Sequence, residues 1–440
     1  MREMKDSGIE WIGEIPKEWK ICRIKELFHE VNERCDDGSD YTLLSVSEYY
    51  GVAPRASKIN DDDLLTHSET LDGYKVCHKH DIVMNIMLAW KGSLGLSEYV
   101  GIVSPAYCVY RANMEIDEKY FHYLFRTDLY TSLFKQFSTG IIDSRLRLYP
   151  DKFLSLKCQV APLPTQHRIA DYLDDKCGKI DRYIEQQKQV IEKLKAYKQS
   201  VITEAVTKGL DPTVPMKDSG VEWIGEIPEG WEVRKLKSLT TIISKGTTPT
   251  TVGKDLVDFG NIRFIKCENI IGGEIENEPE FFIDEETNEK LKRSKLEIND
   301  ILFVIAGATI GKTAIVKESN LPANTNQAVS FVRLKNKSDA RFVWYYLQSN
   351  MVKAVLKLLS VQSAQPNLSM TDLGNFYLPY TEYKTQNEID NYLDKKCSAI
   401  DSAIEKKQTL IDKLTEYKKS LIYEVVTGKR EVQKYGKKQL

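Results

Sequence analysis

The chain of 440 residues lacks an excess of basic residues, because its formal net charge is −2 at pH 7. Nucleic-acid-binding domains usually carry such an excess, so charge alone does not indicate this class of function. The sequence also lacks an uncharged apolar run of the roughly 20 residues that span a bilayer. Its start, MREMKDSGIEW, has no apolar signal core. We therefore expect a cytoplasmic protein that does not associate with membranes.

The eight cysteines form no Cys-x-x-Cys pair. Scattered cysteines are typical of reduced, buried thiols and not of a disulfide framework. The one local cluster is Cys77-His78-Lys79-His80, which lacks further ligands at the spacing of a zinc site. We interpret this cluster as the edge of a strand and predict no metal site.

What the sequence does contain is a long internal repeat. MKDSGIEWIGEIPKEW (residues 4–19) returns as MKDSGVEWIGEIPEGW (216–231). DYLDDKCGKIDRYIEQQKQVIEKLKAYKQSVITEAVT (171–207) returns as NYLDKKCSAIDSAIEKKQTLIDKLTEYKKSLIYEVVT (391–427). The offsets of 212 and 220 residues far exceed the period of a solenoid, which is about 20 to 50 residues. The pattern indicates a tandem duplication of a whole domain with its helix, and predicts a pseudo-twofold molecule.

Each copy ends in a long tail with helical periodicity. Apolar residues recur there at the 3-4 spacing of a coiled-coil seam. A tail of about 40 residues forms a rod of about 60 Å, too long for an internal helix of one domain. We predict that the two tails pair with each other as an antiparallel coiled coil. The predicted seam consists of Ile169, Leu173, Cys177, Ile180, Ile184, Ile191, Leu194 and Val201 in the first tail, and Ile389, Leu393, Cys397, Ile400, Ile404, Ile411, Leu414 and Leu421 in the second.

The repeat also divides the chain into domains. Runs such as DILFVIAGA and QAVSFVRL are rich in β-branched and aromatic residues and predict strands, and they alternate with amphipathic helices. The predicted fold class is α+β, with two mixed, mainly β domains separated by two long antiparallel coiled-coil helices. The predicted divisions are a first domain at 1–160 with its entry motif at 4–19, a first long helix at 161–208, a linker at 209–222, a second domain at 223–380, a second long helix at 381–427, and a basic tail at 428–440.

AGATIGKT (residues 306–313) nearly matches the phosphate-loop pattern G-x-x-x-x-G-K-[ST]. A phosphate loop needs a helix after its glycines, because the helix N-terminus helps to hold the phosphate. The segment after Lys312 alternates apolar residues as a strand does. Aligning the two copies matches Gly92 with Gly311 but puts Ser93 opposite Lys312. We therefore predict a tight hairpin here and not a nucleotide site.

No catalytic constellation is evident in the sequence. A methyltransferase would need a glycine-rich cofactor loop that opens a parallel sheet. A nuclease would need metal-binding carboxylates and a lysine on one sheet. Since neither pattern is visible, we predict that the chain has no catalytic residues.

The ordered set of motifs resembles the specificity subunits of type I restriction-modification systems. The resemblance covers nearly the whole chain, and it rests on the duplicated WIGEIPxxW motif, the helix openings PLPTQHRIADYLD and TEYKTQNEIDNYLD, and the two tails. It implies a non-catalytic subunit with two target-recognition domains, each reading one half of a bipartite site in double-stranded DNA. The long helices would set the spacing between the halves and dock two methyltransferase subunits.

The resemblance also implies where the cofactors bind. The methyltransferase subunits would methylate adenine with S-adenosylmethionine, and added motor-nuclease subunits would cleave unmodified DNA with ATP and Mg. This chain itself would bind none of them. In one departure from the pattern, the second copy has LPYTEYKTQ where the first has APLPTQ. Part of the proline-rich entry to the helix is lost there, so partner contacts at that end are expected to differ.

Loop side chains are the candidates for reading DNA. Contacts to phosphates position a protein, and contacts to base edges specify the sequence, with Arg pairing with guanine and Asn or Gln with adenine. The amide-rich loop VQSAQPNLS fits this role best. The candidates are Arg55, Lys58, Lys91, Arg145 and Arg147 in the first domain, and Lys245, Thr247, Thr248, Thr309, Lys312, Asn324, Asn326, Gln327, Gln362, Gln365 and Asn367 in the second.

The tryptophans of the entry motif, by contrast, recur identically in both copies. A feature common to both copies cannot distinguish two half-sites. We therefore predict that these four side chains pack where each domain meets the helices. They are Trp11, Trp19, Trp223 and Trp231.

Other classes of function are alternatives to this interpretation. A scaffold protein with two binding modules on a coiled coil would act without DNA. A phosphate-loop nucleotidase would bind ATP and lose it on the change Lys312→Ala. A third alternative, within the same family, is a stand-alone subunit with an altered partner.

Overall fold

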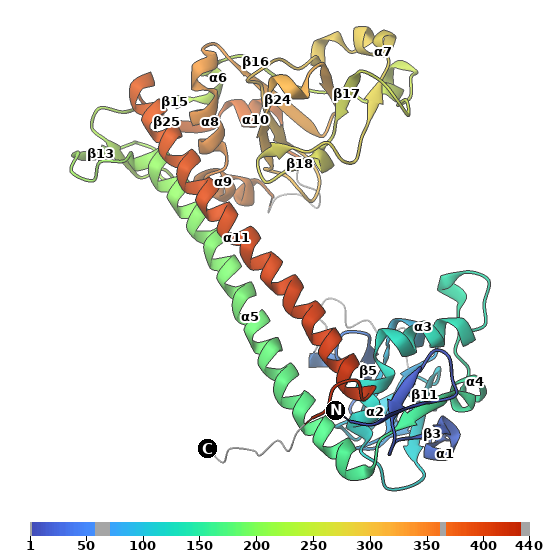
Figure 1. Ribbon diagram of the computed structural model, residues 1–440. Coiled ribbons are helices and arrows are strands. Elements are labelled where there is room, and N and C mark those ends of the chain that lie inside the picture. Colours follow the sequence, from blue (N-terminus) through green and yellow to red (C-terminus); the bar gives the residue numbers. More distant parts are fainter. Residues whose placement is uncertain (1, 58–70, 361–366, 433–440) are drawn as a thin grey trace. The chain divides into compact units, whose positions relative to one another are not determined.

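The computed structural model divides the chain into two units (Figure 1). Unit 1 contains Met1–Gln187 and Thr409–Leu440, and unit 2 contains Lys188–Gln408. Two long helices run through both units, α5 (Leu163–Lys208) and α11 (Tyr383–Val426). Each unit therefore combines one globular domain with one part of each helix. The structure describes residues 2–57, 71–360 and 367–432.

The domain of unit 1 is built on a four-stranded antiparallel sheet in the order β4-β11-β8-β9. Its side chains alternate between two cores, as the period of two along a strand requires. Ile82 and Met84 of β8 pack among the aromatic side chains of the helices α2 and α3, whereas Val83 packs against the hairpin β5-β6. The elements are β4 (Phe28–Val31), β8 (Ile82–Asn85), β9 (Leu94–Leu96), β11 (Tyr107–Ala112), α2 (Glu118–Phe125), α3 (Asp128–Phe137), β5 (Leu44–Ser47) and β6 (Gly51–Pro54).

Small β pairs and two short helices complete this domain. The entry motif forms one pair, and the strand that leads into α5 pairs back onto the strand after that motif. The elements are β1 (Met4–Asp6) with β2 (Glu14–Pro16), β3 (Lys20–Arg23) with β12 (Lys157–Val160), β7 (Lys75–Cys77) with β10 (Gly101–Val103), α1 (Ile24–Leu27) and α4 (Pro150–Ser155).

The domain of unit 2 repeats the four-stranded sheet in the order β16-β24-β21-β22. The helices α8 and α9 cover it as α2 and α3 cover the first sheet, and a three-stranded sheet β20-β17-β23 is added. The elements are β16 (Thr240–Lys245), β21 (Ile301–Val304), β22 (Thr313–Ile315), β24 (Val329–Leu334), β17 (Ile262–Ile265), β20 (Phe282–Ile283), β23 (Ala323–Thr325), α8 (Ala340–Leu347) and α9 (Asn350–Ser360).

The predicted linker at 209–222 differs from the structure at one point. Met216–Asp218 is a strand, β13, because the second entry motif forms the same hairpin as the first. The other elements of unit 2 are β14 (Glu226–Pro228), β15 (Glu232–Lys235), β25 (Tyr377–Tyr380), β18 (Ile270–Ile271), β19 (Glu274–Ile275), α6 (Leu236–Leu239), α7 (Glu285–Lys290) and α10 (Met370–Gly374).

An ion pair to a buried carboxylate marks the duplication at the level of atoms. Asp81, at the start of β8, accepts hydrogen bonds from Nε and Nη2 of Arg111 at 2.8 and 2.9 Å. Asp300, at the start of β21, accepts the same two bonds from Arg333 at 2.8 and 2.7 Å. Both carboxylates are buried, and a buried charge needs such a partner. The two sheets therefore share their internal chemistry as well as their topology.

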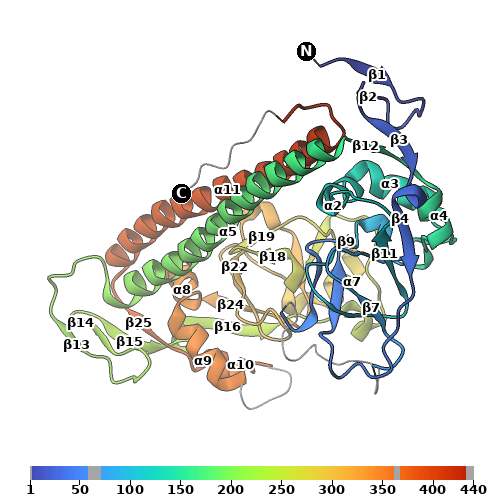
Figure 2. The same cartoon turned by 90° about the horizontal axis from the view of Figure 1, so that it is seen from below.

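The segments of α5 and α11 lie side by side and run in opposite directions within each unit (Figure 1, Figure 2). Lys418 pairs with Asp181 in unit 1 at 2.7 Å, and Lys198 pairs with Asp401 in unit 2 at 2.6 Å. These two ion pairs are related by the 220-residue repeat. Every predicted seam residue is buried or half-buried, which agrees with the predicted coiled coil.

Each domain closes onto the end of the helix that belongs to the other copy. Trp19 is fully buried against Leu421 and Val425 of α11, and Trp231 is buried against Val206 of α5. Packing was predicted for all four tryptophans, but Trp223 is 40% exposed. No helix in the described part of the chain is long and apolar enough to cross a membrane.

Asp390 on α11 is a buried carboxyl without a counterpart in the first copy, which has Ala170 at this position. Burial raises its pKa to about 7, although the nearby charge of Arg341 lowers it. Its Oδ1 atom has no hydrogen-bond partner among the described residues. The folded state therefore holds a proton that the unfolded state releases at a lower pH.

Replacing this aspartate with asparagine tests that assignment. Since the folded-state pKa is raised, the carboxyl's contribution to stability is complete at low pH and is lost as pH rises from about 4 to about 7. We expect Asp390→Asn to raise the free energy of unfolding by a few kcal/mol at about pH 8 and to leave it unchanged at about pH 4. Thermal denaturation of both proteins at each pH measures this; an equal effect at both pH values would contradict it.

Candidate nucleic-acid interface

Four strand ends meet at one end of the sheet in unit 2. β16 ends at Lys245 and β21 ends at Val304, while β22 begins at Thr313 and β24 begins at Val329. The antiparallel order places these four positions at the same edge. We call this edge, with the loops that leave it, the unit 2 sheet end. Its loops are 246–248, 305–312, 326–328 and 367–368.

Backbone hydrogen bonds hold these loops together. The amide of Thr247 donates to the carbonyl of Thr325 at 3.1 Å, the amide of Ile305 to Ala328 at 2.9 Å, and the amide of Leu368 to Ile305 at 2.8 Å. The chain segments come from four distant parts of the sequence. The sheet end is therefore a fixed surface and not a set of independent loops.

Most candidates of the second domain lie on this surface. The Thr248 hydroxyl donates to Oε1 of Gln327, and Asn326 accepts a hydrogen bond from the amide of Ala328 at 3.2 Å. The side chains of Lys245 and Gln327 are exposed. The candidates that the sheet end brings together are Lys245, Thr247, Thr248, Thr309, Lys312, Asn326, Gln327 and Asn367.

Asn324 must be withdrawn from the candidates. It lies on β23 and is fully buried. Its amide nitrogen donates to Oδ1 of Asn288 at 3.2 Å and to the carbonyl of Leu291 at 3.1 Å. A side chain enclosed in this way has no surface with which to contact DNA, so its role is structural.

Lys266 is a candidate that sequence reasoning missed. It follows β17, which runs parallel to β23 and pairs Ile265 with Thr325, so Lys266 comes next to Asn326 at the sheet end. Its Nζ lies 3.4 Å from the ring centroid of Phe281. Pairing between strands this far apart in the chain leaves no local signal in the sequence.

Unit 1 has an equivalent sheet end. The amide of Leu148 donates to the carbonyl of Ile86 at 2.9 Å, which repeats the bond between Leu368 and Ile305. The backbone at Leu148, which follows the loop with Arg145, therefore bonds to the first sheet at the position where Leu368 bonds to the second. We call this edge, with loops 86–93 and 139–147, the unit 1 sheet end.

The candidates of the first domain differ in how free their side chains are. Lys91 is exposed, with its Nζ 5.2 Å from the ring centroid of Trp90, and Arg145 is exposed as well. Nη1 of Arg147 donates a hydrogen bond to the carbonyl of Leu146 at 2.9 Å, so this part of the guanidinium is bound within the protein. Arg55 is half-buried.

Arg55 lies close to the start of β11. Burial raises the pKa of the Tyr107 phenol there, and the charge of Arg55 lowers it. Arg55 therefore lies near the unit 1 sheet end, where β11 begins. Three further candidates, Lys58, Gln362 and Gln365, lie outside the residues that the structure describes.

AGATIGKT forms the predicted hairpin. β21 and β22 pair antiparallel, with Leu302 opposite Ala314, and Gly311 adopts a φ of 88° at the turn. A strand follows the glycines where a phosphate loop would need a helix. Lys312 lines a cavity together with Lys195 and Lys353.

Cys77 and its neighbours form a strand end. Cys77 is buried in β7, and burial raises the pKa of its thiol to about 11. Nε2 of His78 lies 3.0 Å from a carboxylate oxygen of Glu33. Within residues 2–57, 71–360 and 367–432, no group of three or more His, Cys, Asp and Glu side chains could hold a metal ion.

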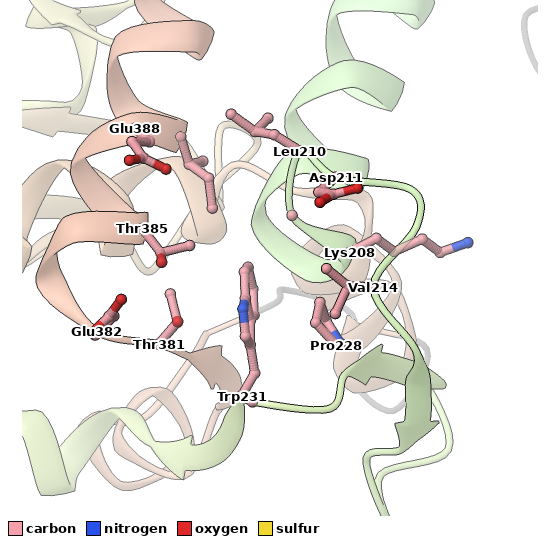
Figure 3. A pocket seen from close by; sticks show the side chains of 13 residues that line it. Lys208, Leu210, Asp211, Val214, Pro228, Trp231, Thr381, Glu382, Thr385 and Glu388 are labelled. Atoms are coloured by element: carbon pink, nitrogen blue, oxygen red, sulfur yellow. The ribbon is translucent and has the colours of Figure 1, made fainter.

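A second surface feature of unit 2 is a cavity of about 510 Å³ where α5 ends and α11 begins. Trp231 stands at its centre, with Glu382 and Glu388 on one side and Asp211 on the other, while the side chain of Lys208 points away (Figure 3). The repeat places Pro162 and Arg168 at the positions of the two glutamates in the first copy. The departure at TEYKTQ therefore gives the unit 2 junction two carboxylates that have no acidic counterpart in the first copy.

The chain is similar to known proteins over most of its length. The family model for the type I restriction modification DNA specificity domain matches residues 16–196 and 228–416. The MjaVIII type I restriction enzyme specificity subunit of Methanocaldococcus jannaschii is 27% identical over 403 residues, which cover 87% of this chain and 88% of that protein. The EcoBI specificity subunit of Escherichia coli is 29% identical over 238 residues, 52% of this chain and 48% of that protein.

A solved structure shares the fold. It comes from a study of complex assembly and conformational transition of the type I R-M system. The two chains superpose with a TM-score of 0.68 at 15% sequence identity, covering 94% of this chain and 98% of the other. Together with the helix and strand content, this agrees with the predicted α+β class with two domains and two long helices.

The unit 2 sheet end contains a glycine, Gly246, whose surroundings leave no room for a side chain. A Cβ atom at Gly246 would lie 1.9 Å from the carbonyl oxygen of Thr325. We expect Gly246→Ala to destabilise unit 2 by about 2 kcal/mol or more, because overpacking forces the backbone apart. Gly230→Ala is the matched control, since a Cβ there meets nothing within 4 Å. Chemical denaturation measures both; equal stability of the two variants would contradict the prediction.

Proposed function

Because this chain belongs to the family of type I restriction-modification DNA specificity subunits, we propose that its two sheet ends each read one half of a bipartite DNA site. The chain is a non-catalytic specificity subunit with two recognition domains. The observation that carries the proposal is the repetition of one scaffold beneath unlike loops. Arg145 and Lys91 face outward at one sheet end, and Lys245, Gln327 and Asn367 at the other. Unlike side chains on the same scaffold fit two different half-sites.

The helices support a role as spacer and docking surface. The two tails are similar in sequence and carry the same interhelical ion pair in both units. A surface that occurs twice fits two copies of one partner. We assign this surface to two methyltransferase subunits, and the length of the helices to the spacing between half-sites.

The catalytic steps are assigned to partner subunits. The methyltransferase subunits would bind S-adenosylmethionine and methylate adenine, and motor-nuclease subunits would use ATP and Mg to cleave unmodified DNA. The assembly would act in the cytoplasm. The near-neutral charge of this chain is consistent with partners supplying much of the contact to phosphate.

Methylation mapping tests the proposal. The chain is expressed with its methyltransferase, and modified adenines in the host DNA are located by methylation-sensitive sequencing. We expect one split motif with methyladenine in both halves. Gln327→Ala with Asn367→Ala should lose or relax one half only, because both side chains lie at the unit 2 sheet end, and each base contact is worth about 1 to 3 kcal/mol.

Arg145→Ala is the matched variant at the unit 1 sheet end, and it should relax the other half. Loss of both halves from a change at one sheet end would contradict the division of labour. A stable complex that methylates no sequence would favour the scaffold alternative. ATP binding by the isolated chain that disappears with Lys312→Ala would favour the nucleotidase.

A further inference from the structure

Unit 2 contains a cavity of about 510 Å³ whose wall includes Lys195, Lys198, Lys312 and Lys353. We infer that this cavity binds a phosphate group of the DNA backbone and thereby positions DNA against the unit 2 sheet end. The inference rests on the proposed function and adds a phosphate site to it. We call this feature the lysine cavity.

The lysine cavity is formed by the helix pair and the domain together. Lys195 and Lys198 come from α5, Lys353 comes from α9, and Lys312 comes from the turn between β21 and β22. Apolar side chains and turn glycines form the rest of the wall. They include Ile202, Ile270, Gly272, Gly273, Ile310 and Leu356.

The charges in the wall are only partly compensated. Lys198 pairs with Asp401 at 2.6 Å, and Lys195 pairs with Glu192 at 2.8 Å. Asp401 is the single carboxylate among the lining residues that the structure describes. The cavity therefore has an excess of positive charge, and it favours an anion.

Two of the lysines have no carboxylate partner among the residues that the structure describes. Lys353 donates to the neutral side-chain oxygen of Gln199, and burial lowers the pKa of its ammonium. Lys312 is exposed, and its side-chain ammonium has no ion-pair or hydrogen-bond partner in the described part of the chain. A phosphate in the cavity would pair with both ammonium groups.

The duplicated domain shows that this charge is not a requirement of the fold. Ser93 stands at the position of Lys312, and Thr131 stands on α3 where Lys353 stands on α9. Arg126 follows α2 where Gln348 follows α8, and it donates to four backbone carbonyls of its own domain at 2.6 to 3.2 Å. In unit 1 the guanidinium of Arg126 is therefore bound to backbone carbonyls. In unit 2 Lys312 and Lys353 line a cavity instead.

The position of the cavity agrees with a role in DNA binding. Lys312 and Thr309 belong to the same short turn, and the amide of Lys312 donates to the carbonyl of Thr309 at 3.2 Å. Thr309 lies on loop 305–312 of the unit 2 sheet end. A phosphate held by Lys312 would therefore lie next to the side chains assigned to base reading. Phosphate contacts of this kind fix the register of a protein on DNA.

The salt dependence of DNA binding tests the inference. The complex of this chain with its methyltransferase is titrated with DNA that carries the motif, over a series of salt concentrations. We expect Lys312→Ala with Lys353→Ala to weaken binding about tenfold on cognate and unrelated DNA alike. The slope of log affinity against log salt should fall by about 1 for each lost phosphate contact, and the methylated motif should be unchanged.

Lys317→Ala is the matched control, because this lysine lies on the same domain, is exposed, and pairs with Glu274 outside the cavity. It should change neither affinity nor slope. Lys312→Arg with Lys353→Arg keeps the charge and should retain most of the affinity. Equal melting temperatures of the alanine variant and the unmodified protein would show that folding is intact.

The outcomes separate the two proposals. If the unmodified complex binds no DNA specifically, the proposed function fails. If it binds DNA and the alanine variant keeps both affinity and slope, the lysine cavity is not a DNA site and this inference alone is overturned. Equilibrium dialysis with ATP distinguishes a free nucleotide: ATP binding that is lost in the alanine variant, with an unchanged DNA slope, would also overturn the assignment to DNA.

Discussion

Neither domain of this protein can cover its own apolar edge, and the rest of the structure depends on that constraint. In unit 1 the indole of Trp19 is covered by Leu421 and Val425 from α11, and the hydroxyl of Tyr120 donates to the carbonyl of Val426 at 3.1 Å. In unit 2 Trp231 is covered by the end of α5. Burial of such large side chains is worth several kcal/mol. Each domain is therefore anchored to a helix end, and the pairing of the helices is fixed with it.

A second constraint, the pairing of buried carboxylates, helps to explain which parts of the two copies remain alike. Loss of the arginine that pairs with a buried carboxylate such as Asp81 or Asp300 would leave a buried charge unpaired, which is strongly destabilising. The sheet ends carry no such penalty, since side chains like Arg145 and Gln327 are exposed. Recognition can diverge at these edges while the sheet, the entry motif and the helix tails stay constant.

Sequence reasoning succeeded where a structural signal is local or repeated. The periodicity of the tails predicted the seam, and the strand-like residues after Lys312 predicted the hairpin of β21 and β22. It failed where distant strands meet: Asn324 looks like a loop amide, but β17 and β23 enclose it, and the same parallel pairing brings Lys266 to the sheet end. The lysine cavity was missed for this reason as well, because Lys195 and Lys198 read as ordinary surface positions of a helix.

The small net charge of the chain and its local lysine cavity fit together. A protein with an overall charge of −2 has little long-range attraction for DNA, so a few well-placed cations decide where a phosphate can bind. Lys312 illustrates this, because it occurs in one copy of the hairpin and is replaced by Ser93 in the other. The buried hydroxyl of Ser93 donates to the carbonyl of Val46 at 2.9 Å. The same position thus makes an internal hydrogen bond in the first domain and lines the proposed anion site in the second. A duplicated scaffold can acquire two unequal DNA-binding halves in this way.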